Sequence, residues 1–278
     1  MTSPVQTAVG RDTRLFFIDY LRAALVSLVV LHHLAVIYGG IPAFYYWESP
    51  VNDPLAEITL LVFVLFNQAW FMGALFLQAG YFTPGSFERK GPASFLKDRL
   101  RRLGLPLLVW IFVLNPISAI GFFYMPTSIT GITEPLTWQA YPYLLGLGPL
   151  WFVAMLLIFS FGYAAWRRLT KNRGFFSLNK SSPPSYLAVG LFIAALALAS
   201  YLLRIIIPLG KSVFGFPSLA YLPQYLSFFV VGIIAARRNW AKTIPESMGK
   251  AGFAIAGIAA FTLFPIAFVS LLSAAESG

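Results

Sequence analysis

The stretch RLFFIDYLRAALVSLVVLHHLAVIYGG, residues 14–40, decides the fold, because it is a long apolar run with few ionisable side chains. A helix of about 20 apolar residues rises far enough to cross the roughly 30 Å hydrocarbon core of a bilayer. Six further runs of this kind follow along the chain. We therefore predict an all-α fold, a polytopic transmembrane helix bundle of about seven spans. The predicted spans are at about residues 15–38, 57–82, 103–125, 149–166, 186–207, 219–236 and 251–273.

The composition fits lipid as the surrounding solvent. Apolar residues make up 58% and charged residues 11% of the 278 residues, and the mean hydropathy is +0.75. This leaves too little polar surface to cover a water-soluble globule of this size. The chain has no cysteine, which excludes disulfides and zinc-thiolate sites, and we expect no metal site. The net charge of +10 lies in short loops beside apolar runs, so no nucleic-acid partner is expected.

The basic residues predict which side of the membrane each loop faces. Seventeen of the 20 Lys and Arg residues fall before the first predicted span or in the loops after the second, fourth and sixth spans. The remaining loops hold Glu48, Asp53 and Glu134, with Lys211 as their one cation. Cytoplasmic loops of membrane proteins carry an excess of Lys and Arg. The sequence therefore predicts a cytoplasmic N-terminus.

The first predicted span carries Asp19, Arg22 and His33 on one stripe. Eleven residues separate Arg22 from His33, so the two side chains point within roughly 20° of each other and lie about 16 Å apart along the axis. Ionisable groups inside a span usually face the bundle interior or a water-filled cleft. A functional site fits this pattern, and so does an (i, i+3) pair of Asp19 and Arg22 with a satisfied interior histidine. His32 points about 100° away and fits a structural neighbour better.

Three blocks of sequence resemble the membrane-bound acyltransferase 3 family. The first is DYLRAALVSLVVLHH, residues 19–33, with its Arg-x10-His spacing. The second is GYFTPGSFERKGPASFLKDRLRRLGLP, residues 80–106, with an Arg-x2-Arg element at Arg99 and Arg102. The third is GPLWFVAMLLIF, residues 148–159. The blocks occur in the family's order, and the resemblance covers most of the chain.

The resemblance implies a single transmembrane acyltransferase-3-like domain over residues 1–278, in the cytoplasmic membrane of a bacterium. It implies an enzyme that moves an acyl group from a cytoplasmic acyl-CoA-type donor to a hydroxyl of a glycan or other envelope acceptor. The expected partners are the lipid bilayer, acyl-CoA as cosubstrate and the acceptor, and no tightly bound cofactor is expected. Family members usually have more spans than the seven predicted here, so the chain is either a short variant or part of a longer protein.

The resemblance also implies roles for the first span. His33 would act as general base on the acceptor hydroxyl, or help to pass the acyl group across the bilayer. Arg22, paired with Asp19, would attract the anionic donor or polarise its carbonyl. We expect Arg22 and His33 to line one cavity with Arg99 or Arg102 at its mouth.

Further candidates lie outside the first span. Arg99, Arg101 and Arg102 sit in the basic loop, where Arg99 and Arg102 share a helix face suited to clamping the phosphates of CoA; simple positive-inside anchoring is the alternative. Arg204, near the outer end of the fifth predicted span, either extends to the headgroups or faces the cleft on the acceptor side. Trp151 is a candidate for stacking on a sugar, although aromatic residues in a bundle are more often core.

Two other functions use the same residues. A proton-coupled transporter or channel would use Asp19, Arg22 and His33 as a relay. It predicts pseudo-symmetric halves with interrupted helices in matching positions, and no such repeat is visible in the sequence. A binding-only membrane scaffold is the third interpretation.

Overall fold

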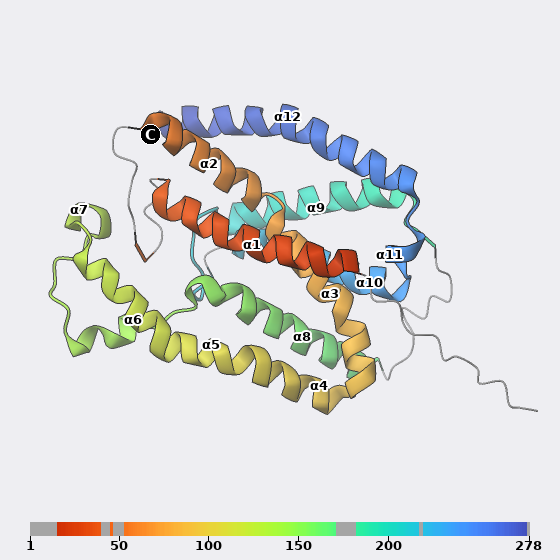
Figure 1. Cartoon of the computed structure of the whole chain (residues 1–278), viewed down its shortest axis with the longest axis horizontal. Coiled ribbons are helices and arrows are strands. Elements are labelled where there is room, and N and C mark those ends of the chain that lie inside the picture. The colour runs from red at the N-terminus through yellow and green to blue at the C-terminus, as the bar shows by residue number, and fades with distance from the viewer. Residues whose placement is uncertain (1–15, 40–44, 47–52, 171–181, 217–218, 277–278) are drawn as a thin grey trace, which may run out of the picture.

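The computed structural model describes residues 16–39, 45–46, 53–170, 182–216 and 219–276 (Figure 1). These residues are almost entirely helical, with one isolated β-bridge between Val213 and Phe216. Seven helical segments in the described part are long and apolar enough to cross a membrane. The predicted seven-span helical bundle is therefore confirmed, and the protein is a multi-pass membrane protein. The seven segments are residues 16–38, 54–90, 92–124, 138–169, 186–206, 219–237 and 246–270.

The α-helices follow in chain order as α1 (Phe16–Tyr38), α2 (Pro54–Gln68), α3 (Phe71–Lys90), α4 (Pro92–Arg99), α5 (Leu105–Val109), α6 (Asn115–Ala119), α7 (Thr127–Thr130), α8 (Trp151–Leu169), α9 (Tyr186–Ile206), α10 (Leu222–Arg237), α11 (Trp240–Thr243) and α12 (Glu246–Glu276). The π-helical turns η1 (Leu100–Gly104) and η2 (Trp110–Leu114) join α4, α5 and α6 into one span. The 3-10 turns are η3 (Ile120–Tyr124), η4 (Trp138–Leu144), η5 (Gly148–Leu150) and η6 (Leu219–Tyr221).

The second span is two helices, where the sequence predicted one. Asp53 caps the start of α2 by accepting a hydrogen bond from the amide of Ala56 at 3.0 Å. The helix is interrupted between Gln68 and Phe71. The side-chain amide of Gln224 on α10 donates to the carbonyl of Ala69 at 2.8 Å, which satisfies an acceptor at the break.

Two glycines let α3 and α10 pack backbone against backbone. A Cβ atom on Gly80 would lie 2.0 Å from the Phe229 carbonyl oxygen, and one on Gly232 would lie 2.0 Å from the Leu77 carbonyl oxygen. Any side chain at either position would collide with the facing helix. Small residues allow this close approach in membranes, where van der Waals packing holds helices together.

Aromatic side chains fill the space between α3, α8 and α10. Phe76 is fully buried, and its ring centre lies 4.9 Å from that of Tyr225 and 5.3 Å from that of Phe159. The first helix joins this core through Gln78 of α3, whose amide donates to the carbonyl of Ile18 at 2.9 Å. By contrast, none of the apolar window of α9 or of α12 is buried, so both present apolar side chains outward.

Candidate functional site

The bundle has two chemically different ends. Helices α3, α8 and α10 finish at one end, at the right in Figure 1, with Arg and Lys side chains in their last turns. We call this the basic end. The opposite end, where α1 finishes and α8 begins, contains a cavity of about 890 Å³ and is the cavity end. Its walls come from α1, α6, α8 and the segments around residues 132–149 and 212–215, and its polar or aromatic members include His32, His33, Tyr45, Asn115, Phe122, Phe123, Glu134, Gln139, Tyr143, Trp151 and Ser212.

His33 stands in the wall of this cavity in a defined tautomer. Its Nδ1 lies 2.7 Å from the carbonyl oxygen of Val29. A carbonyl can only accept, so Nδ1 of the neutral ring carries the proton and Nε2 is the basic nitrogen. His33 therefore has the chemistry of a general base at a cavity wall.

His32 also lines the cavity, which the sequence did not predict. Its side chain is buried, and its Nδ1 has no hydrogen-bond partner among the described residues. Its ring centre lies 4.9 Å from that of Phe71 and 5.8 Å from that of His33. The buried positions of α1 are Ile18, Leu25, His32 and Ala35, so the seven-residue steps from Ile18 to His32 were the available signal.

A tyrosine and an asparagine form a second polar group in the wall. The Tyr45 hydroxyl donates to Oδ1 of Asn115, and the Asn115 amide donates to the carbonyl of Leu144. Gly148, at a φ of 46°, lets the chain pass close to this pair, because a Cβ there would collide with the Tyr45 hydroxyl. Burial raises the pKa of Tyr45 to about 12, so the hydroxyl keeps its proton at neutral pH. Sequence reasoning missed this pair, for which an asparagine inside an apolar run is the only trace.

The two acceptor-side candidates occupy different places. Trp151 is buried and lines the cavity, with its ring centre 5.4 Å from that of Tyr225. Arg204 is exposed and does not line the cavity; its guanidinium lies 5.1 Å from the centre of the Tyr221 ring. Glu48, one of the acids in the loops predicted on the same side as Arg204, lies outside the described residues. Contact of either side chain with an acceptor stays a prediction.

The expectation that Arg22 shares the cavity with His33 is wrong. The Arg22 side chain is 57% exposed, pairs with Asp19 at 3.3 Å, and is not among the residues that line the cavity. The two residues point in similar directions, but three helical turns separate them by about 16 Å, and the cavity reaches only the last turns of α1. Asp19 and Arg22 therefore belong to the basic end and His33 to the cavity end.

The placement of the basic loop at the cavity mouth is wrong for the same reason. Arg99, Arg101 and Arg102 lie at the basic end, and none of them lines the cavity. Arg102 forms an ion pair of 2.9 Å with Asp98, while the guanidinium of Arg99 lies 5.0 Å from the centre of the Phe95 ring. Arg99 and Arg102, predicted to bind one phosphate together, thus contact different partners. Phosphate binding by these residues stays a prediction.

Comparison with known proteins matches residues 15–276 to the acyltransferase domain of the acyltransferase 3 family. The glucans biosynthesis protein C of Escherichia coli strain K12 is 26% identical over 243 residues, which cover 80% of this chain and 58% of that protein. The protein of the same name from Salmonella paratyphi B is 27% identical over 238 residues, with the same coverage of 80% and 58%. The one from E. coli O17:K52:H18 is 25% identical over 272 residues, 90% of this chain and 65% of the relative.

The chain thus spans between 58% and 65% of the length of these curated relatives, all of which are bacterial. No solved structure matches the chain. Because the family match covers nearly the whole sequence, the chain belongs to the acyltransferase 3 family, and its seven apolar helical segments make it a multi-pass membrane protein.

Proposed function

We propose that this protein is an integral membrane acyltransferase that moves an acyl group from an acyl-CoA-type donor to a hydroxyl of a glycan. Family membership supports acyl transfer, and the relatives' name, glucans biosynthesis protein C, supports a glycan acceptor. The observation that carries the proposal is His33, a histidine with a defined basic nitrogen in the wall of a cavity large enough for sugar residues.

In the proposed reaction, Nε2 of His33 accepts the proton of an acceptor hydroxyl while the oxygen of that hydroxyl attacks the thioester carbonyl of the donor. The new carbon–oxygen bond forms, the carbon–sulfur bond breaks, and the proton passes to the departing thiolate. A hydroxyl is a weak nucleophile, so this proton transfer is the step that most needs assistance. The aromatic and amide side chains of the cavity wall suit the faces and hydroxyls of a sugar.

Arg22 takes a different part in this proposal. At about 16 Å from His33 along α1, it is too far to polarise the carbonyl attacked at the cavity end. The remaining role is attraction of the anionic donor at the basic end, together with Asp19. The thioester end of the bound donor then has to extend about 16 Å along α1 to reach His33.

The decisive variant is His33→Asn, because asparagine can still donate to the Val29 carbonyl but cannot accept a proton. We expect transfer from labelled acyl-CoA to membrane glycans to fall by about 100-fold or more, the usual contribution of a general base. Tyr38→Phe is the matched control on the same helix, since Tyr38 does not line the cavity. Wild-type transfer by His33→Asn at equal expression would remove the catalytic assignment.

A further inference from the structure

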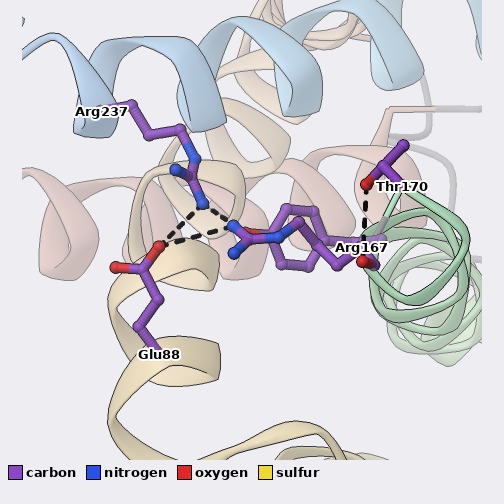
Figure 2. Close-up of polar contacts among 5 residues, drawn as sticks. Glu88, Arg167, Thr170 and Arg237 are labelled. Atoms are coloured by element: carbon purple, nitrogen blue, oxygen red, sulfur yellow. Dashed lines mark hydrogen bonds and ion pairs between the residues drawn. The ribbon is translucent and has the colours of Figure 1, made fainter. Parts of the chain in front are cut away.

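Two arginines share one carboxylate at the basic end, where α3, α8 and α10 meet (Figure 2). Nη2 of Arg237 lies 2.8 Å from Oε1 of Glu88, and Nη1 of Arg167 lies 3.5 Å from the same oxygen. Both guanidiniums also donate to the hydroxyl of Tyr163, at 3.1 and 3.2 Å respectively. The two cations thus point at one spot, which Glu88 occupies with a single negative charge.

The arginines are held in place, whereas the carboxylate faces outward. The side chains of Arg167 and Arg237 are only 13% and 18% exposed, but that of Glu88 is 54% exposed. Arg167 also lies over the ring of Phe87, 5.4 Å from its centre, and Tyr163 beneath both cations is buried. An exposed carboxylate contributes little to an ion pair, so a stronger anion can displace it at small cost.

This arrangement differs from simple membrane anchoring. Arginines that anchor a protein to headgroups extend outward and are exposed, and the Arg102 side chain has such an exposure, at 72%. Arg167 and Arg237 are instead drawn inward, where they share the one carboxylate of Glu88 among the residues that the structure describes. In addition, Nε of Arg237 is buried without a hydrogen-bond partner among the described residues. Buried donors normally have partners, so this atom indicates an acceptor that Glu88 does not supply.

We propose that Arg167 and Arg237 form a phosphate-binding site at the basic end, and that Glu88 occupies the site until a phosphate displaces it. A phosphate brings up to two negative charges and several acceptor oxygens, which match two forked guanidiniums better than one carboxylate oxygen does. The phosphate belongs either to a soluble CoA-type donor or to a lipid headgroup. Its assignment to the acyl donor rests on the proposed function; the phosphate site itself does not.

The first test measures CoA binding to the purified protein in nanodiscs of neutral phosphatidylcholine, by isothermal titration calorimetry. Arg167→Gln and Arg237→Gln each remove charge-assisted hydrogen bonds and are expected to weaken binding by about ten-fold or more. Arg89→Gln is the control, because it makes the same change of charge at an exposed arginine of the same end that has no proposed role in binding. We expect its affinity to stay within about two-fold of wild type.

Glu88→Gln separates a binding site from a purely structural tie. If Glu88 competes with the phosphate, its neutralisation tightens CoA binding by about three-fold or more. If the cluster only fastens three helices together, Glu88→Gln leaves CoA binding unchanged or weaker and lowers the unfolding temperature. If wild type binds CoA, the second result overturns the proposal, as do arginine variants that bind CoA as tightly as Arg89→Gln. Both arginines remain in Glu88→Gln, so this arm holds even if an arginine variant fails to fold.

A second arm identifies the source of the phosphate. CoA binding that depends on Arg167 and Arg237 in neutral nanodiscs identifies a soluble ligand. An unfolding temperature that rises with phosphatidylglycerol in wild type but not in Arg237→Gln, without CoA binding, identifies a headgroup. The absence of both responses would overturn the phosphate site. CoA binding without any acyl transfer would leave the phosphate site standing and refute only the proposed function.

Discussion

Replacing Gly232 by alanine is expected to force α3 and α10 apart. A Cβ at this position lies 2.0 Å from the Leu77 carbonyl oxygen, whereas ordinary contacts begin at 3.4 Å. The helices therefore have to separate by about 1.4 Å, the difference between these two distances. The obstacle is backbone, so no side-chain rotation relieves it. Overpacking of this kind typically costs about 1–3 kcal/mol.

The matched control is Gly190→Ala on α9, which makes the same chemical change where no other atom lies within 4 Å of the new Cβ. Alanine favours a helix over glycine by about 1 kcal/mol, and this gain applies to both variants. The difference in unfolding temperature between the two variants therefore reports the effect of the collision alone. At about 2–4 °C per kcal/mol, Gly232→Ala should unfold several degrees below Gly190→Ala.

Thermal unfolding in nanodiscs, followed by intrinsic tryptophan fluorescence, measures this difference. A second readout is CoA binding, because Glu88 and Arg237 sit on the two helices that separate, with only 2.8 Å between their paired atoms. Because moving Glu88 away from Arg237 weakens its competition with the phosphate, we expect Gly232→Ala to bind CoA more tightly than Gly190→Ala. An unfolding temperature for Gly232→Ala equal to or above that of Gly190→Ala would refute the close-packed crossing.

Two further predictions concern buried hydrogen bonds. Burial raises the pKa of Tyr45 to about 12, so its hydroxyl should stay neutral and keep donating to Asn115 about two pH units beyond the usual tyrosine range. Wild type and Tyr45→Phe should therefore give the same tyrosinate absorbance up to about pH 11. A difference between them at lower pH would contradict the burial of Tyr45. Gln78→Leu removes the side-chain donor to the Ile18 carbonyl and should lower the free energy of unfolding by about 1–3 kcal/mol. Gln139→Leu, at an exposed position, should change it little, and equal losses would count against the interhelical bond.

The spans could be predicted because lipid imposes one simple requirement on every segment that crosses it. Each crossing needs a long apolar run, and hydropathy alone locates such runs. The break at Ala69 and Trp70 was missed because the run as a whole stays apolar across it, with only Asn67 and Gln68 as polar residues. What permits the break is a hydrogen bond from Gln224, a residue 155 positions away in the sequence. Contacts of that kind leave no local pattern.

The candidate site was predicted in part. Helical geometry places Arg22 and His33 at similar angles around α1, but direction alone could not show how far along α1 the cavity extends. Most of the wall comes from irregular segments such as residues 132–149, which have no periodicity from which to infer a shared face. The cluster of Glu88, Arg167 and Arg237 was not predicted, because the positive-inside rule already accounted for both arginines.

The outermost helix also determines how the molecule meets bilayers of different thickness. With 31 residues, α12 is about 46 Å long, against a hydrocarbon core of about 30 Å. Its link to α2 includes the rings of Phe66 and Phe264, whose centres are 5.6 Å apart, and none of its apolar window is buried. A helix of excess length with so little packing can change its tilt as the lipids thin or thicken. The glycine crossing of α3 and α10 need not move with it, so changes in lipid chain length can be absorbed at the rim while the spacing of the inner helices is preserved.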